Sequence, residues 1–450
     1  MWISITPYVI SILIVGLGIA GAVALRPRLF WPILIFVAVG TLGLKVQGYC
    51  LVDEYFTGCV LIGSLLAISI GAAPPRREPI SNLNYLHILI FYLMITYMIA
   101  ESIRGLVLWG DPRLMRWVIY YAMLGMLLFI ISKRDFPVPS ARNTALVVSW
   151  SALLYFAAYL GQGFYAEAFR HASRFSTQGF EWAGSAGATF PLVAAVPAAI
   201  FLLRDSARKW RGLGVALIVV SMIVAYYYDS RVAYLVIMAF LIASPTVLGL
   251  RRAAIFVALV LVALGGIYFF GSWAGFMERI SRISQMLSGS VDFLWSPRAS
   301  DVDRYALMYA SFSAVNANLW TWLFGYGIYS ERFVIVPYLR RLYGSIPGVN
   351  KSLGNLARTE AFEALFIDTG YIGMLLLTGN FFFVALSLIA QKSPMRIILL
   401  LALVLTFLWL FVADIQDAVL LYLIIMPMGP LAQLGQRRTA TQALSNLSAN

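Results

Sequence analysis

Charged side chains are scarce in this chain of 450 residues: Asp, Glu, Lys and Arg make up 12% of it, whereas hydrophobic residues make up 61%. Soluble domains carry about 25% charged residues and roughly 45–50% apolar ones. The composition therefore excludes a water-soluble protein, and its hydrophobicity excludes a disordered one. It is typical of a chain that crosses a membrane many times.

Cysteine and histidine are rare as well, with two residues of each. Cys50 and Cys59 are too few for a disulfide framework or a metal cluster, and His87 and His171 are too far apart in the sequence to indicate a metal site. The chain also lacks a P-loop, a glycine-rich dinucleotide motif, a zinc-protease motif and a nucleophile elbow. We therefore expect neither a metal nor a cofactor.

Hydrophobic runs near the length of a membrane span, about 20 residues, recur along the whole chain. They are continuous rather than alternating, which indicates helices and not barrel strands. We predict an all-α, polytopic transmembrane bundle of about 13 spans, within a range of roughly 12–14. The expected spans cover residues 2–25, 29–44, 56–73, 85–100, 117–132, 144–160, 185–203, 212–228, 232–250, 253–271, 371–390, 397–413 and 418–434.

Basic residues divide unevenly between the two sets of loops that alternate along these spans. One set holds 17 basic and 3 acidic residues, and the other holds 16 basic and 17 acidic residues. The positive-inside rule assigns the first set to the cytoplasm, which puts the N-terminus outside. Topology then explains the formal charge of +13, so that no nucleic acid is expected as a partner.

One expected outer loop, residues 272–370, is far longer than the others and is rich in Trp and Tyr. A structureless loop of this length is unusual, so we expect a folded, partly helical, extracytoplasmic element that carries the functional site. The aromatic rings form either sugar-binding surfaces or the loop's own core and membrane-interface belt. The chain then divides into ten spans with short loops (1–271), the long loop (272–370), three spans (371–438) and a polar cytoplasmic tail (439–450).

Two helices are expected within this loop. The first begins at Ser300 as its cap, runs to about residue 318, and is followed by a break at the two glycines of residues 324–327. The second covers residues 361–369, and Gly370 opens the next span.

Arginine predominates among the cations of the expected outer face, with 14 Arg against 2 Lys. The guanidinium forms forked hydrogen bonds that suit phosphate and diphosphate. Arg231, in a short turn between two spans, either snorkels to the interface, pairs with Asp229, or binds a lipid-linked phosphate. Arg304 is expected in the first turn of its helix, where the dipole disfavours a cation. It therefore binds an anionic ligand or pairs with Asp301 or Asp303.

Three carboxylates, Glu360, Glu363 and Asp368, precede the span that begins near residue 371. Glu360 and Glu363 are three residues apart and can share a helix face. A carboxylate near several arginines is suited to act as a general base on a hydroxyl. The alternative for Glu363 and Asp368 is a capping or surface role.

Four stretches of the sequence, in order, resemble the bacterial family of O-antigen ligases and Wzy-type polysaccharide polymerases, which are integral membrane glycosyltransferases of the GT-C type. Residues 174–179 are similar to the family's arginine-containing loop before a helix, and residues 229–235 to its Ser-Arg turn. Residues 303–327 resemble its Arg-led helix that ends at a Gly-x-Gly turn, and residues 359–373 the segment that ends in Gly-x-x-Gly.

The resemblance implies a metal-independent enzyme of the bacterial inner membrane, with its active site on the periplasmic face. Ligases of the family usually carry a histidine about where this chain has Thr359 and Glu360, whereas many polymerases carry an acidic residue there. The polymerase branch is therefore favoured. The implied reaction transfers the growing glycan from undecaprenyl diphosphate to the non-reducing-end hydroxyl of an incoming lipid-linked repeat unit.

The resemblance also implies roles for particular residues. Glu360 would be the base, while Arg231 and Arg304 would bind the diphosphate and stabilise the leaving group. The residues implied to bind substrate are Arg170, Arg174, Tyr305, Arg358 and Glu363. The implied partners are the lipid-linked donor and acceptor, membrane lipids, a chain-length regulator and a flippase. The alternatives are an O-antigen ligase or O-oligosaccharyltransferase and, in a different class, a lipid-linked oligosaccharide flippase or transporter.

Overall fold

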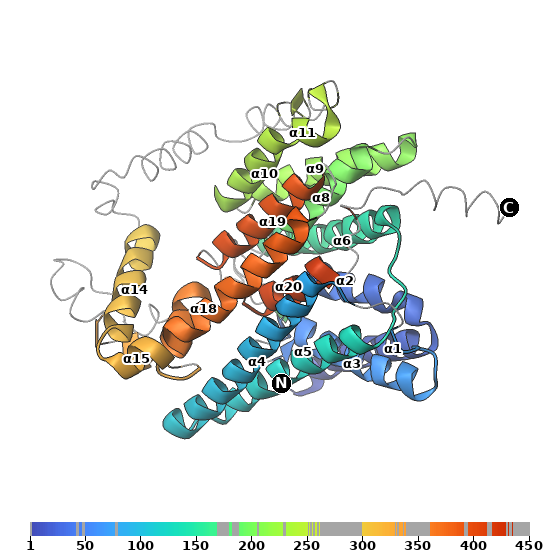
Figure 1. Cartoon of the computed structure of the whole chain (residues 1–450). Helices are drawn as coiled ribbons and strands as arrows, with labels where there is room; N and C mark the ends of the chain where they lie inside the picture. The colour runs from blue at the N-terminus through green and yellow to red at the C-terminus, as the bar shows by residue number, and fades with distance from the viewer. Residues whose placement is uncertain are drawn as a thin grey trace.

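The structure of the chain is a computed structural model. It describes residues 2–41, 45–46, 50–76, 80–168, 180–181, 189–204, 207–227, 231–250, 299–328, 361–390, 395–411 and 416–428, together with residues 252, 254, 257, 258, 261, 330, 333–335, 337, 338, 431 and 434. Within this part the protein is almost entirely helical (Figure 1), which confirms that the fold is built from helices.

The elements follow one another with short connections. The N-terminal part contains α1 (Trp2–Leu25), η1 (Pro27–Leu29), α2 (Phe30–Gly40), α3 (Val52–Ser69), α4 (Asn82–Trp109), η2 (Pro112–Leu114), α5 (Met115–Lys133) and α6 (Ala141–Ala168). The C-terminal part contains α8 (Leu192–Leu203), α9 (Arg208–Tyr227), α10 (Arg231–Ala243), α11 (Pro245–Leu248), α14 (Ala299–Val315), α15 (Leu319–Phe324), α18 (Ala361–Ile389), α19 (Met395–Trp409) and α20 (Gln416–Met428). Three two-residue strands, β1 (Lys45–Val46), β2 (Cys50–Leu51) and β3 (Phe180–Glu181), pair antiparallel in the order β2-β1-β3.

Three of the described helices, α4, α5 and α18, are long and apolar enough to cross a membrane, by length and composition. Shorter apolar helices accompany them. Large hydrophobic side chains point outward from the bundle: Leu17 is 71% exposed, Leu375 is 73% exposed and Val107 is 78% exposed. Exposed apolar surface on this scale suits a lipid environment. The number of 13 spans stays a prediction.

The outer end of α4 differs from the expectation. The hydropathy pattern predicted a span over residues 85–100 and placed Glu101 and Arg104 in the loop that follows, but the helix continues to Trp109. Ser81 caps its start, and Gly110 ends it in the left-handed conformation (φ 65°). Glu101 and Arg104 are tolerated inside the helix because they form an ion pair of 2.8 Å across one turn. A helix of 28 residues is about 42 Å long, so it extends past a hydrocarbon layer of about 30 Å.

Antiparallel packing of α4 against α18 forms the middle of the bundle. At one end of this interface the Ser387 hydroxyl donates to the Asn84 side-chain oxygen at 2.8 Å. At the other end the Tyr97 hydroxyl donates to the Thr369 carbonyl oxygen at 2.7 Å. The two hydrogen bonds fix the register of the two helices at both ends.

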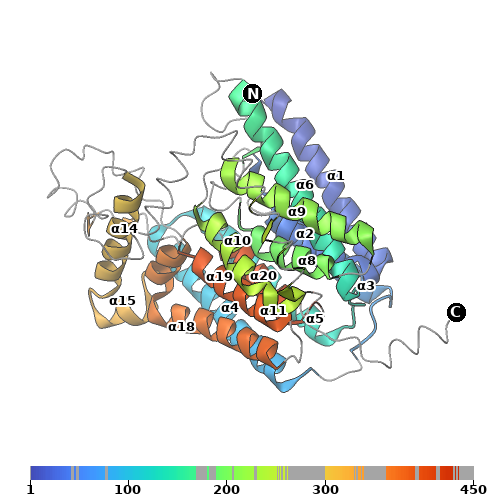
Figure 2. The ribbon, with the colours of Figure 1, turned by 90° about the horizontal axis from the view of Figure 1, so that it is seen from above.

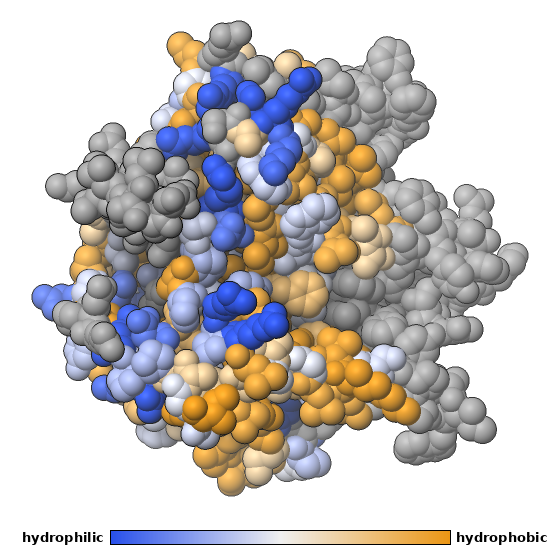
Figure 3. Space-filling view, turned by 90° about the vertical axis from the view of Figure 1, so that its right-hand side faces the viewer, coloured by the Kyte–Doolittle hydropathy of each residue, from blue (hydrophilic) through white to orange (hydrophobic). Residues whose placement is uncertain are grey.

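The two sides of the molecule differ in character. α14 and α15 stand beside the first turns of α18 at one side, and α1 and α3 lie at the opposite side (Figures 1 and 2). The right-hand side of Figure 1 receives the connection from α1 to α2 and the segment between α5 and α6. Hydrophilic side chains gather there into a patch bordered by hydrophobic surface (Figure 3).

A forked ion pair joins the starts of α3 and α5. Nε of Arg116 donates to both carboxylate oxygens of Glu54, at 3.0 and 2.9 Å, and Nη2 donates to Oε1 at 2.8 Å. Glu54 is buried, whereas the Arg116 side chain is partly exposed.

We predict that Arg116→Ala lowers the free energy of unfolding by about 1–3 kcal/mol, because it leaves a buried carboxylate without this donor. Arg116→Lys should lose less, since it keeps the charge and loses the fork. Thermal unfolding in detergent measures both, with the exposed Arg396→Ala as a control that should stay at the wild-type value. Wild-type stability of Arg116→Ala would contradict the assignment.

Candidate functional site

The glycine turn of residues 324–327, which follows α15, lies against the middle of α18. The Tyr326 N–H donates to the Ile367 carbonyl oxygen at 2.8 Å, and the Gly327 N–H donates to the Asp368 carbonyl oxygen at 2.9 Å. These carbonyls come just before Gly370, whose φ of 61° and ψ of −160° interrupt α18. The two glycine motifs that the sequence places 43 positions apart, at Gly327 and Gly370, thus meet in one contact.

The last turns of α4 hold the same turn from the other side. The Ile328 N–H donates to the Glu101 carbonyl oxygen at 3.2 Å. Nη2 of Arg104 donates to the Phe324 carbonyl oxygen at 2.8 Å and also pairs with Glu101 at 2.8 Å. The Glu101 side chain is 6% exposed and that of Arg104 is 23% exposed, so this pair is largely removed from water. The described part of the long loop is therefore fastened to both α4 and α18.

Glycine is required where these backbones approach each other. Gly325 and Gly370 both have positive φ, which L side chains rarely adopt. A Cβ on Gly370 would lie 2.6 Å from the Gly325 nitrogen and from the Leu323 carbonyl oxygen. A Cβ on Gly105 of α4 would overlap the Ile328 carbonyl oxygen. The contact is backbone against backbone, with no space for a side chain.

Asp368 fixes the chain that leaves the turn. Its Oδ1 accepts hydrogen bonds from the Ser330 N–H at 3.0 Å and from the Ser330 hydroxyl at 2.8 Å. Both residues are buried. Asp368 thus acts as a buried cap for residue 330, which agrees with the structural alternative that the sequence left open for it.

Aromatic and aliphatic side chains surround the turn. Trp109 of α4 stacks on Phe333 with ring centroids 4.7 Å apart and planes 6° from parallel. A small hydrophobic core joins the described loop to α18, and it consists of Leu307, Ala310, Ala314, Val315, Val334, Ile335, Phe366 and Ile367. The predicted folding of the long loop is confirmed for its described residues.

The rings of this loop divide between the two roles that the sequence left open. Trp322 packs against Tyr371 with centroids 4.7 Å apart, and Tyr326 donates from its hydroxyl to the Ala314 carbonyl oxygen at 3.1 Å. Burial raises the pKa of Tyr326, so this hydroxyl stays protonated and serves as a structural donor. Tyr309 and Trp320, in contrast, are 52% and 63% exposed and remain available to a ligand.

The predicted site residues are described to different extents. Arg231 is the first residue of α10, and Glu363 is buried in the first turn of α18. Arg304 and Tyr305 belong to α14, of which the structure describes the backbone at these positions. The remaining predicted residues lie outside the described part of the chain, and these are Arg170, Arg174, Arg358 and Glu360.

One expectation about Arg304 is wrong. The helix begins at Ala299, so Ser300 lies inside it, and Arg304 falls in its second turn instead of its first. The helix dipole acts mainly within the first turn, so the electrostatic conflict that singled out Arg304 is smaller than expected. The break near residue 370 is confirmed, since α18 consists of one helical segment before Gly370 and another after it.

Sequence reasoning missed the part that α4 plays. Glu101 and Arg104 were read as outer-loop charges, yet they hold the glycine turn. The available signal was the spacing of opposite charges by three residues in a stretch free of helix breakers between Ser81 and Gly110. Among the described residues, no group of three or more His, Cys, Asp or Glu side chains is arranged to hold a metal ion.

A scan of the chain against protein-family models gives no match, and a search of the curated proteins finds no significant relative. The resemblance carried by the four sequence stretches therefore remains a prediction. Function is argued below from those stretches and from the contacts between them.

We predict that Gly105→Ala destabilises the protein by about 1–3 kcal/mol, because the added methyl group overlaps the Ile328 carbonyl oxygen. Gly21→Ala in α1 is the matched control, since a Cβ there meets nothing within 4 Å. That change should be neutral or stabilise by up to about 1 kcal/mol. Melting temperatures in detergent compare the two, and equal values for both variants would refute the close contact.

Proposed function

We propose that the protein is a membrane glycosyltransferase of the polysaccharide-polymerase kind. It moves a growing glycan from undecaprenyl diphosphate to the non-reducing-end hydroxyl of an incoming lipid-linked repeat unit. The observation that carries the proposal is the contact between residues 324–327 and the kink at Gly370. Two of the stretches that resemble the polymerase family thereby belong to one structural unit.

The proposal includes a bacterial inner membrane, about 13 spans, and a site on the periplasmic side. In this orientation the end of α4, the loop helices α14 and α15, and the start of α18 face the periplasm. Their position together at one side of the molecule supports it (Figure 1). The hydrophilic patch on the side seen in Figure 3 then faces the cytoplasm.

Arg231 and Arg304 are the proposed ligands of the diphosphate. Arg231 begins α10, and the first N–H groups of a helix lack partners within it and carry a partial positive charge. In both ribbon views α10 starts at its end nearer α14 and runs away from it toward α11 (Figures 1 and 2). The helix that contains Arg304 and the start of α10 are thus oriented toward the same side.

Glu360 is the proposed base, and it immediately precedes the first residue of α18. This helix start is anchored on α19: the Phe362 N–H donates to the Leu410 carbonyl oxygen at 2.8 Å, and the rings of Phe362 and Phe411 stack at 3.9 Å. A base next to an anchored helix start keeps a constant position relative to α14, which packs on the same helix.

In the proposed reaction, Glu360 accepts the proton of the acceptor hydroxyl while that oxygen attacks the anomeric carbon of the donor. The bond from the anomeric carbon to the phosphate oxygen breaks, and its electron pair leaves with undecaprenyl diphosphate. Arg231 and Arg304 stabilise the charge that develops on this leaving group. No metal is needed in this scheme. The proposed substrate-binding residues are Arg170, Arg174, Tyr305, Arg358 and Glu363.

We predict that Arg231→Ala and Arg304→Ala each leave the protein in the membrane but lower polymer formation by about 100-fold or more, because one donor to a developing charge is lost. Glu360→Gln should have an effect of similar size, since it removes the proton acceptor. Arg396→Ala, on a predicted cytoplasmic loop, is the matched control and should retain full activity.

The measurement is the glycan length distribution in a deletion strain that carries each variant. Loss of a polymerase leaves a single repeat unit attached to the carrier, whereas loss of a ligase leaves the surface without any. Wild-type chain lengths from both arginine variants would contradict the site assignment. A bare surface would replace the polymerase by the ligase.

A further inference from the structure

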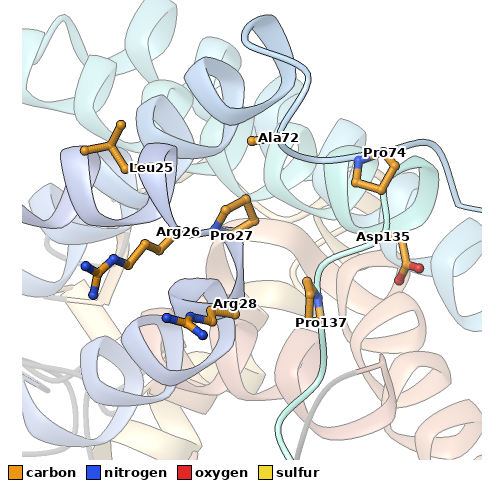
Figure 4. A pocket seen from close by; sticks show the side chains of 8 residues that line it. All are labelled: Leu25, Arg26, Pro27, Arg28, Ala72, Pro74, Asp135 and Pro137. Atoms are coloured by element: carbon orange, nitrogen blue, oxygen red, sulfur yellow. The ribbon is translucent and has the colours of Figure 1, made fainter.

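A pocket of about 440 Å³ opens between the α1–α2 connection and the segment that joins α5 to α6 (Figure 4). Its charged lining consists of Arg26, Arg28 and Asp135, and the rest is apolar, mainly proline and the side chain of Leu25. This pocket lies away from the glycine turn, on the side of the molecule that Figure 3 shows.

The two walls of the pocket are fixed to each other. The ring of Phe30, which follows η1, stacks on Phe136 at 4.2 Å between centroids. Nε1 of Trp31 donates to the Phe136 carbonyl oxygen at 3.2 Å, and the Asp135 N–H donates to the Pro74 carbonyl oxygen at 2.9 Å. Phe30, Trp31 and Phe136 are buried, so the pocket is formed before a ligand arrives.

The charged side chains of the pocket have no protein partner among the described residues. Arg26, Arg28 and Asp135 are exposed, and their side chains make neither a hydrogen bond nor an ion pair there. Figure 4 shows both guanidinium groups extending to the same side from one wall, with Asp135 on the opposite wall. The lining therefore carries a net charge of +1 with two forked donors available.

We propose that this pocket binds the head group of an anionic phospholipid with one phosphodiester, of the phosphatidylglycerol class. Leu25, at the end of the apolar helix α1, is 77% exposed beside Arg26, which brings the pocket to the membrane surface. Arginine forks suit a lipid phosphate, and basic pockets between spans bind lipid head groups. A lipid of charge −1 neutralises the lining, and the hydroxyls of its glycerol head can donate to Asp135.

Asp135 also defines the selectivity. A lipid with two phosphates brings its second negative charge toward this carboxylate, which is unfavourable. A zwitterionic choline lipid brings no net charge to a lining of +1 and offers no hydroxyl to Asp135. The inference needs only a membrane-embedded chain and holds whether or not the protein is a glycosyltransferase.

The test uses the purified full-length protein in detergent, titrated with phosphatidylglycerol and followed by native mass spectrometry. Replacing both arginines (Arg26→Gln with Arg28→Gln) should weaken binding at least about tenfold, because two charge-assisted contacts are lost. The matched control removes the same charge at two exposed positions elsewhere, Arg208→Gln with Arg396→Gln, and should bind as the wild type does. Asp135→Asn should increase the affinity for cardiolipin several-fold relative to phosphatidylglycerol.

Equal binding of phosphatidylglycerol by the wild type and the double variant would overturn the proposal. So would a wild-type affinity for phosphatidylcholine as high as that for phosphatidylglycerol. Displacement of the bound lipid by millimolar inorganic phosphate would reassign the pocket to a soluble anion. Glycan chain length is measured in parallel, since a lost polymer with retained lipid binding affects only the proposed function.

Discussion

The contact of one glycine turn with two membrane helices is the constraint on which the rest of this structure depends. Residues 325–327 lie so close to Gly105 and to the kink at Gly370 that only hydrogen atoms fit between the backbones. Hydrogen bonds from the turn to α18 and from Ile328 to α4 replace the water that these amides would otherwise bind. Such a contact forms in one register, so it determines where α14 and α15 stand relative to the bundle.

Charge is placed with the same economy around this contact. The Glu101–Arg104 pair is nearly excluded from water, and its guanidinium satisfies the Phe324 carbonyl oxygen at the end of α15. Asp368 serves the same purpose for Ser330. These groups support the turn, which leaves Arg231, Arg304 and Glu360 as the proposed reactive set. On the opposite side, Arg26 and Arg28 have no such partner, and this difference is why a ligand is inferred there.

Local patterns predicted much of this arrangement, and long-range contacts account for the rest. The first span coincides with α1, and the break at Gly370 followed from its glycine in an apolar run. The end of α4 was missed because hydropathy treats Glu101 and Arg104 as separate charges, although one helical turn pairs them. The bond from Arg104 to Phe324 joins residues 220 positions apart, a pairing that no local pattern encodes. The approach of residues 231 and 304 is likewise a matter of tertiary structure.

Cross-linking tests the docking of the loop on α4 most directly. With Cys50 and Cys59 replaced, cysteines are introduced at Trp109 and Phe333, whose rings stack 4.7 Å apart. The matched pair carries cysteines at Leu25 and Phe333, on elements at opposite sides of the molecule. A short thiol-specific reagent applied to native membranes should join the first pair intramolecularly and leave the second unjoined. Equal cross-linking of both pairs, or of neither, would contradict the account.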